Sequence, residues 1–162
     1  MLDAAGLLGW LEASALAQAM RGGLWLYPVV ETVHILGFVI LVGAVAMFDL
    51  RVLGCAPGLP VDALGRHLLP WSAASLALVV PAGLMLFSAH PQDFIGNRVF
   101  LFKLGLIALA GINALLFHLG PYRTVAAWNS GVTAPAAARL HALASLALWI
   151  TVIVCGRFLA YT

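Results

Sequence analysis

The hydrophobic positions of the chain gather into four long runs that are almost free of charged side chains. The runs cover about residues 24–50, 68–89, 99–119 and 136–159. Each run is long enough to cross about 30 Å of hydrocarbon, because a helix rises about 1.5 Å per residue. A helix also satisfies its own backbone hydrogen bonds where no water is present. The pattern therefore predicts four transmembrane helices.

Segments rich in Gly, Pro and polar residues separate the four runs. They cover residues 54–60, 91–97 and 120–135. Such residues end helices and form turns. The chain has no internal repeat, so we expect an all-α fold, in which residues 23–162 form one polytopic membrane four-helix bundle.

Residues 1–22 mix Leu and Trp with acidic and amide side chains. We expect them to form one amphipathic helix that lies in the membrane interface. A cleaved signal peptide is the alternative, because the Ala-Ser-Ala sequence at residues 13–15 fits a small-residue cleavage site. No basic residue precedes the apolar part of this segment, which favours the interfacial helix.

Composition supports the membrane prediction. Of the 162 residues, 64% are hydrophobic and 9% are charged, whereas soluble domains are about half apolar and a quarter charged. A net charge of +2 is too small for an electrostatic grip on nucleic acid. The two cysteines, Cys55 and Cys155, fall near opposite membrane faces, so we expect no disulfide between them.

The arginines give a small bias between the two membrane faces. The first span begins at one membrane face, which we call face A. We call the opposite face B. Cytoplasmic loops carry an excess of Lys and Arg, so face B is predicted to be cytoplasmic and both termini periplasmic, in a bacterial inner membrane. Face B carries Arg51, Arg66, Arg123 and Arg139, and face A carries Arg21, Arg98 and Arg157 with Asp3, Glu12 and Asp93.

One group of ionisable side chains lies within the spans toward face A. Charge in hydrocarbon is costly, so each such residue needs a partner or a role. Glu31 and His34 share one helix face, and Lys103 lies at the depth of Glu31, about 9 Å from the bilayer midplane. We expect a Glu31–Lys103 ion pair with His34 beside it. The group either fixes the helix register or carries protons. The Glu-x-x-His spacing of di-iron bundles is not repeated on a second helix.

A second group lies toward face B. His118 and His141 are roughly 10–14 Å from the midplane, with Asn113 nearer to it and His67 further out. Neutral imidazole binds haem iron and copper. We expect His118 and His141 to bind haem b, with His67 or His34 as substitutes, and the arginines of face B to meet the propionates. A copper site of His67, His118 and His141 is the alternative. Without a cofactor, these are half-polar rings in the headgroup region.

Helix periodicity brings Asp49 to the same face as Glu31, five whole turns along the first span. Arg157 points about 160° away from His141, so we expect it to reach the interface at face A unless the helix is irregular. The polar residues expected to form a buried cluster are Glu31, His34, Asp49, Lys103, Asn113 and Arg157.

Several short motifs resemble a bacterial integral-membrane family catalogued as a domain of unknown function. They include YPVVETVHILG at residues 27–37, DLRVLG at residues 49–54 and NRVFLFK at residues 97–103. The resemblance covers nearly the whole chain. It implies a four-span inner-membrane protein and brings no established activity. The residues that it singles out are Glu31, His34, Asp49, Arg51, Asn97, Lys103, Asn113 and Arg157.

Three functions remain open. The first is a small redox subunit that binds haem or a metal through the histidines. The second is an accessory subunit of a larger membrane complex, in which the polar residues only specify packing. The third is a transporter or proton path through Glu31, His34 and Lys103, which we expect to work as a homo-oligomer. No nucleophile–base pair or phosphate-binding loop is present, so the sequence does not predict hydrolase chemistry.

Overall fold

The computed structural model describes residues 4–159 and 161. This part of the chain is helical and contains no strand. Four helices are long and apolar enough to cross a membrane: α3 (Leu26–Val52), α4 (Val61–Ala89), α6 (Arg98–Leu119) and α7 (Ala136–Phe158). The predicted four-helix membrane fold is confirmed.

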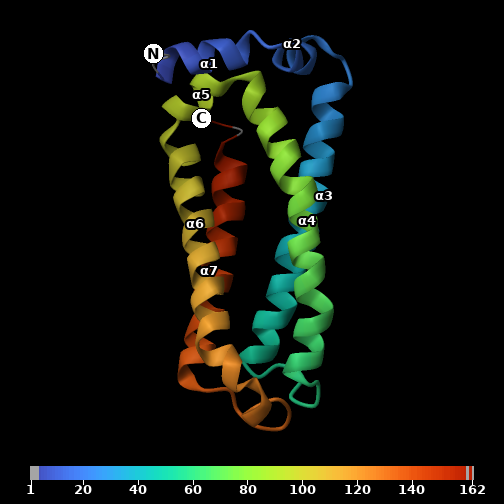
Figure 1. Ribbon diagram of the computed structural model, residues 1–162, viewed down its shortest axis with the longest axis vertical. Helices are drawn as coiled ribbons and strands as arrows, with labels where there is room; N and C mark the ends of the chain where they lie inside the picture. Colours follow the sequence, from blue (N-terminus) through green and yellow to red (C-terminus); the bar gives the residue numbers. More distant parts are fainter. Residues whose placement is uncertain (1–3, 160, 162) are drawn as a thin grey trace.

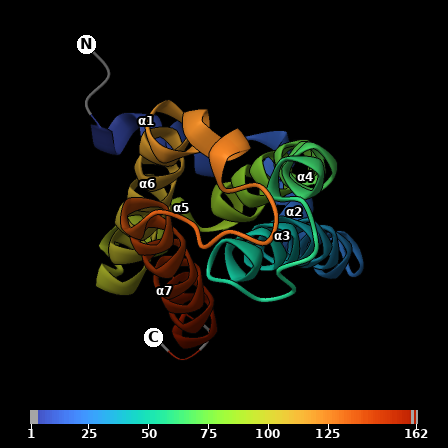
Figure 2. The same ribbon diagram turned by 90° about the horizontal axis from the view of Figure 1, so that it is seen from below.

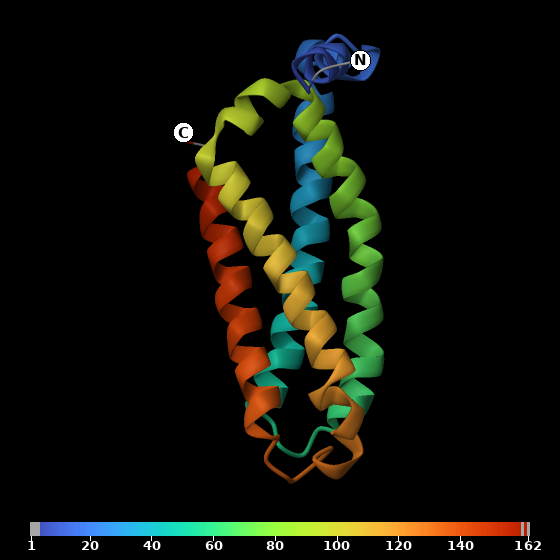
Figure 3. The same ribbon diagram turned by 60° about the vertical axis from the view of Figure 1, so that its left-hand side comes forward.

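The four long helices form two antiparallel pairs (Figures 1 and 3). Helix α3 packs along α4, α6 packs along α7, and the pairs meet where α3 contacts α7. Seen from face B, α3 and α6 lie diagonally opposite each other (Figure 2), and their backbones do not come into contact. This arrangement decides which polar side chains can meet inside the bundle.

A glycine allows the close approach of α3 to α4. A Cβ atom added at Gly37 would lie 2.9 Å from Val79 Cγ2 and 3.0 Å from Leu78 Cβ. Real Cβ atoms do not tolerate such distances, so a larger residue at this position would force the two helices apart. The small residue is thus required by the helix–helix interface, as is common in membrane bundles.

The end of α4 at face B differs from its predicted boundary. We expected the span to begin near residue 68, but the helix begins at Val61. Residues 61–67 include the polar side chains of Asp62, Arg66 and His67, so hydropathy does not detect this part of the helix. Asn129 caps the first turn from a distant loop: its backbone carbonyl accepts from Val61 N (2.9 Å) and its Oδ1 accepts from Asp62 N (3.0 Å).

The N-terminal segment contains two helices where we expected one. Helices α1 (Ala4–Glu12) and α2 (Ala15–Gly22) lie across the face A end of the bundle (Figure 1). Ser14 begins α2, because its side-chain oxygen accepts a hydrogen bond from Ala17 N. Arg21 then joins three elements, donating to the last carbonyls of α1 at Glu12 (2.8 Å) and of α4 at Ala89 (2.7 Å). Residues 1–3 of the predicted segment lie outside the described part.

Two of the predicted loops also contain helical turns. Helix α5 (Pro91–Gly96) follows α4, and the 3-10 helix η1 (Pro121–Ala127) follows α6. Both begin with proline, whose fixed φ suits the first position of a helix. The expectation of irregular loops was therefore wrong in these two places.

The interior is apolar at mid-depth. Phe38 of α3 meets Trp149 of α7 edge to face, with ring centroids 5.8 Å apart. Leu106 of α6 and Val152 of α7 are buried in the same cluster. We call these four residues the apolar layer. On each helix, the layer falls between the polar residues near face A and those near face B.

Candidate functional site

His34 is fixed at the interface between α3 and α4. Its Nδ1 lies 2.9 Å from the backbone carbonyl oxygen of Val79. A carbonyl only accepts, so Nδ1 carries the proton and donates it, and Nε2 keeps its lone pair. The ring lies against Gly83, where an added Cβ would come within 3.0 Å of Cε1. His34 is half-buried and takes one tautomer in this position.

Lys103 enters the bundle from α6 at the same level. It is half-buried, and its Nζ lies 3.6 Å from the Cβ position of Gly156 on α7. Its charge acts on His34, as does the charge of Glu31. Among the described residues, Lys103 Nζ has no ion-pair partner within 4.0 Å. A cationic side chain therefore faces the bundle interior without a carboxylate beside it.

The predicted ion pair between Glu31 and Lys103 is wrong. The ion pairs in the described part of the chain are Arg66–Asp62 and His90–Asp93, and Glu31 is exposed. The reason is the helix arrangement, because α3 and α6 lie diagonally across the bundle. In the group of Glu31, His34 and Lys103, the two charged side chains thus each act on His34 without forming an ion pair with each other. We call this group the A layer.

His141 and Asn113 form a two-way hydrogen-bonded pair between α7 and α6. Asn113 Nδ2 donates to the backbone carbonyl of His141 at 3.0 Å, and His141 Nδ1 lies 2.7 Å from Asn113 Oδ1. The amide oxygen only accepts, so His141 Nδ1 is protonated and Nε2 carries the lone pair. Both side chains are half-buried, as expected for inward-facing residues.

Asp49 is the most deeply buried carboxyl group of the bundle interior in the described chain. It is 6% exposed, and it receives a hydrogen bond from the hydroxyl of Ser145 on α7. Its Oδ2 atom has no hydrogen-bond partner among the described residues. The prediction that Asp49 faces inward is confirmed. We call Asp49, Ser145, Asn113 and His141 the B layer.

Arg51 is buried at the B end but does not pair with Asp49. Its Nε donates to the carbonyl of Leu59 at 2.5 Å, and its second terminal nitrogen donates to the carbonyls of Pro57 (3.0 Å) and Asn129 (3.2 Å). The guanidinium therefore ties the loop after α3 to the loop before α7. It is committed to backbone carbonyls, which argues against its predicted role toward haem propionates.

Arg157 lies outside the predicted buried cluster. It is exposed at the face A end, where its guanidinium donates to the hydroxyl of Tyr161 and lies 4.6 Å from the centre of that ring. Helix α7 is continuous through this residue. Its side chain therefore points away from the face that carries His141, as the helix geometry predicted, and the inclusion of Arg157 in the buried cluster was wrong.

The remaining histidines are on the perimeter. His67, His90 and His118 are exposed. His118 Nδ1 lies 2.8 Å from the carbonyl of Ala114, one turn earlier in α6, so it too donates from Nδ1. The ring of Phe117 packs edge-on against both His118 and His141, at centroid distances of 5.5 and 6.2 Å. In the described part of the chain, no three His, Cys, Asp or Glu side chains are grouped to hold a metal ion.

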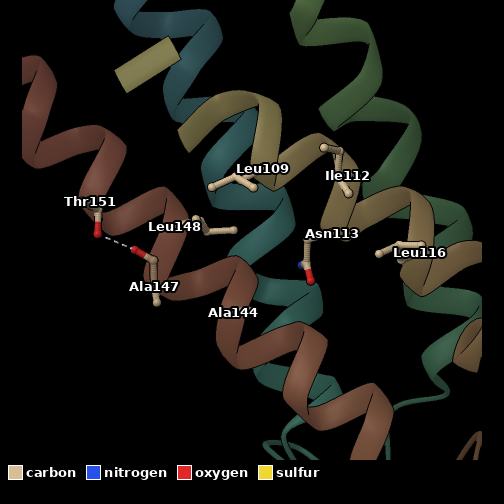
Figure 4. Close-up of a pocket in the computed structure, with 8 residues that line it drawn as sticks. All are labelled: Leu109, Ile112, Asn113, Leu116, Ala144, Ala147, Leu148 and Thr151. Carbon is tan, nitrogen blue, oxygen red and sulfur yellow. Dashed lines mark hydrogen bonds between the residues drawn. The ribbon is translucent and has the colours of Figure 1, made fainter. Parts of the chain in front are cut away.

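A groove of about 500 Å³ runs between α6 and α7 (Figure 4). Its walls are mainly Leu, Ile and Ala side chains. The two polar residues that line it are already engaged, since Thr151 donates to the carbonyl of Ala147 and Asn113 bonds to His141. The groove offers hydrocarbon contact and no free polar group.

Sequence reasoning missed two residues that position these groups. Gly83 makes room for the His34 ring, and Asn129 caps α4 and accepts from Arg51. Neither has a local signal, because Gly83 acts on a side chain of another helix and Asn129 caps a helix that begins far away in sequence. Both roles depend on contacts between segments that are far apart in the sequence, and only the three-dimensional structure shows these contacts.

The fold and the polar layers define the class of this molecule, a four-span all-helical membrane protein with ionisable groups in its interior. Within that class, the chain belongs to the family of unknown function DUF6644, which matches residues 7–162. The resemblance found in the motifs is thereby confirmed. No curated protein and no solved structure matches the chain.

Proposed function

We propose that this protein carries protons across the membrane through the interior of its helix bundle. The observation that supports this proposal most strongly is the A layer. Glu31, His34 and Lys103 lie within predicted spans, and the charges of Glu31 and Lys103 act on His34, but none of the three forms an ion pair with another. Ionisable residues inside membrane spans commonly mark ion pathways and proton relays.

The tautomer of His34 also supports the proposal. Because Nδ1 donates to the Val79 carbonyl, Nε2 is the atom that takes up and releases a proton. Imidazole changes its charge at physiological pH more readily than any other ordinary side chain. A proton held in turn by Glu31 and His34 would enter the bundle from face A beside the Lys103 ammonium.

The apolar layer interrupts this route at mid-depth. Phe38 and Trp149 meet between the A layer and the B layer. A proton therefore crosses only when water enters or when the two rings separate. In the resting state the apolar layer would prevent proton leakage. This arrangement resembles the hydrophobic constrictions that gate channels by dewetting.

Flux measurements on proteoliposomes test the proposal. Purified protein is reconstituted with a pH-sensitive dye inside, and a potassium diffusion potential drives proton entry. We expect wild-type protein to acidify the lumen and Glu31→Gln to fall to the rate of empty liposomes. Asp93→Asn is the matched control, because this carboxylate lies on α5, outside the spans. A wild-type rate equal to that of empty liposomes would contradict the proposal and favour the accessory-subunit function, in which the polar layers serve packing.

A second proposal is cofactor binding by the histidines, as haem b or copper. It is supported by the tautomers of His118 and His141, which both donate from Nδ1 to a fixed acceptor and leave Nε2 for a metal. Metal-binding histidines usually have such an orienting partner. We expect the purified protein to show a haem absorbance band or stoichiometric copper that His141→Ala removes. A colourless, metal-free preparation with intact helicity would contradict this second proposal.

We further propose that face B is cytoplasmic in a bacterial inner membrane and that both termini are periplasmic. Face B carries four arginines against three at face A, which supports this orientation. Two of the four, Arg123 and Arg139, have no carboxylate partner within 4.0 Å in the described chain. Association with a second copy or with a larger membrane complex stays a prediction.

A further inference from the structure

Asp49 combines deep burial with an incomplete set of hydrogen bonds. The residue is 6% exposed, and its Oδ2 atom is buried without a hydrogen-bond partner among the described residues. Ser145, itself 8% exposed, supplies a hydrogen bond to the carboxyl group from α7. Buried polar atoms are nearly always paired, so an ionised carboxylate with an unpaired oxygen in a membrane interior is costly.

The surroundings of Asp49 are apolar. The neighbouring residues Phe48 and Val52 belong to a buried cluster that includes Phe117 of α6 and Ala142 of α7. No solvent reaches Oδ2 there. A carboxylate in such a place loses the hydration that stabilises its charge, and the protein has to replace it.

No charged side chain supplies that replacement. On the same helix, Arg51 donates to loop carbonyls instead. On α7, His141 is engaged through Nδ1 with Asn113, and Arg139 is exposed. On α4, Arg66 pairs with Asp62, and His67 is exposed. Within the described part of the chain, Asp49 has no ion-pair partner within 4.0 Å.

We propose that Asp49 is a proton-binding site on the face B side of the apolar layer. When water enters from face B, the carboxylate takes a proton from a hydronium ion, which leaves as water; Oδ2 gains an O–H bond, and no electron is transferred. Release reverses the step. This inference rests on the proposed function, in which Asp49 would hand protons between the interior and face B. The proposed route would then have proton-binding groups in both the A layer and the B layer.

Infrared spectroscopy of the full-length protein in lipid tests the site without any transport assay. All measurements use protein that carries Glu31→Gln, so that the carboxyl group of the A layer does not contribute. In this protein we expect a carbonyl-stretch band of a protonated carboxylic acid that rises and falls as the pH is titrated. Asp49→Asn should remove this band. Asp62→Asn is the matched control, because Asp62 lies at the same face but pairs with Arg66, and it should leave the band in place.

Two further variants keep the test sharp if Asp49→Asn fails to fold. Asp49→Glu should retain a titrating band at a changed frequency. Ser145→Ala should shift the band without removing it, because the carboxyl group loses its hydrogen-bond donor from α7. In the Glu31→Gln background, a titrating band that Ser145→Ala leaves unchanged, or that persists in Asp49→Asn, would overturn the assignment. The absence of any titrating band in that background would overturn it too.

The outcomes separate this inference from the proposed function. If the band depends on Asp49 but liposomes show no proton flux, the site stands and the transport proposal fails. If flux depends on Glu31 but no titrating band belongs to Asp49, transport stands and the Asp49 site is overturned.

Discussion

The position of His34 depends on the absence of a side chain at Gly83. A Cβ atom there would lie 3.0 Å from Cε1 and 3.4 Å from Nδ1 of the imidazole. The ring would have to move away from α4, and the hydrogen bond to the Val79 carbonyl would lengthen or break. One glycine on α4 thereby determines the tautomer of a histidine on α3.

Gly83→Ala should therefore destabilise the protein by about 1–2 kcal/mol, since it combines a lost hydrogen bond with local overpacking. Thermal unfolding followed by helical circular dichroism measures the effect. Gly105→Ala on α6 is the control: nothing lies within 4 Å of its Cβ position, and alanine favours a helix by up to about 1 kcal/mol over glycine. Equal stability of the two variants would show that the His34 contact is unimportant.

Tyr122 gives the protein a predictable response to alkaline pH. Its hydroxyl lies over Gly65, and its ring packs against Phe48 and Phe117 at the B end. Burial, followed by the negative charge of Asp62, raises the pKa of the Tyr122 phenol above its ordinary value of 10.0. The folded protein thus holds this proton more tightly than the unfolded chain.

The sign of the effect follows from linkage. The contribution of Tyr122 to stability is fully present below the unfolded pKa and is lost as the pH rises through the higher folded pKa. We expect Tyr122→Phe to reduce the alkaline loss of stability, measured by thermal unfolding from neutral pH to above pH 10.0. An alkaline profile identical to that of the wild type would contradict this role.

Helical periodicity predicts for most of the polar residues whether the side chain points toward the bundle interior. It places His34, Asp49, Lys103 and Asn113 toward the interior, and all four are buried or half-buried. It fails for Glu31, which was expected in the buried cluster and is exposed. Periodicity does not predict which helix packs against the face that carries these residues. The Glu31–Lys103 pair was predicted from matching depth alone, and it fails because their helices occupy diagonal corners.

Helix α4 begins where a loop caps it. Its first two backbone N–H groups donate to Asn129, and the carbonyl of that residue also accepts from Arg51. The first turn of a helix has no internal partner for these donors. Asn129 therefore joins the start of α4 to the end of α3 at face B.

Asn129→Ala should cost about 1 kcal/mol of stability, because the Oδ1 acceptor of Asp62 N is lost while the backbone carbonyl remains. Hydrogen exchange at residues 61–64 should accelerate, and thermal unfolding should shift downward. Ser130→Ala is the neighbouring control, as this exposed residue lies next to the cap. An effect as large in Ser130→Ala would point to the loop conformation and not to the cap.

The helix boundaries could be predicted only where a helix begins and ends with its apolar run. Helices α6 and α7 begin and end within about a residue of their apolar runs. By contrast, α4 begins seven residues before its apolar run, in a segment that contains Asp62, Arg66 and His67, and the N-terminal segment is interrupted at Ser14. Both differences arise from capping hydrogen bonds, made by Ser14 and by Asn129. A hydrophobicity pattern does not detect such bonds.

The chain contains its own reporter of membrane orientation. Cys55 is exposed in the loop after α3, at face B, whereas Cys155 is buried in α7. A membrane-impermeant maleimide should therefore label Cys55 in inverted vesicles and not in intact spheroplasts. Cys55→Ser should abolish the labelling. Labelling of Cys55 from outside intact cells would place face B in the periplasm and reverse the proposed orientation.

The number and length of the membrane spans follow from the sequence, but their arrangement around the bundle does not. Apolar side chains cover all sides of the four helices, as in Leu84 and Leu140 at 63% and 68% exposure. Lipid is as apolar as these side chains, so hydrophobicity does not choose helix partners. Close packing at Gly37 and ring contacts such as Phe38–Trp149 make that choice.

The most direct test of proton passage through the bundle interior is the flux of a variant with a thinner apolar layer. Trp149→Ala removes the α7 half of the ring contact with Phe38, and circular dichroism would establish that the variant folds. We expect faster proton entry into proteoliposomes than with wild-type protein, and a return to the rate of empty liposomes when Glu31→Gln is added. An unchanged rate in Trp149→Ala, or a faster rate that persists without the Glu31 carboxylate, would contradict a route through the two polar layers.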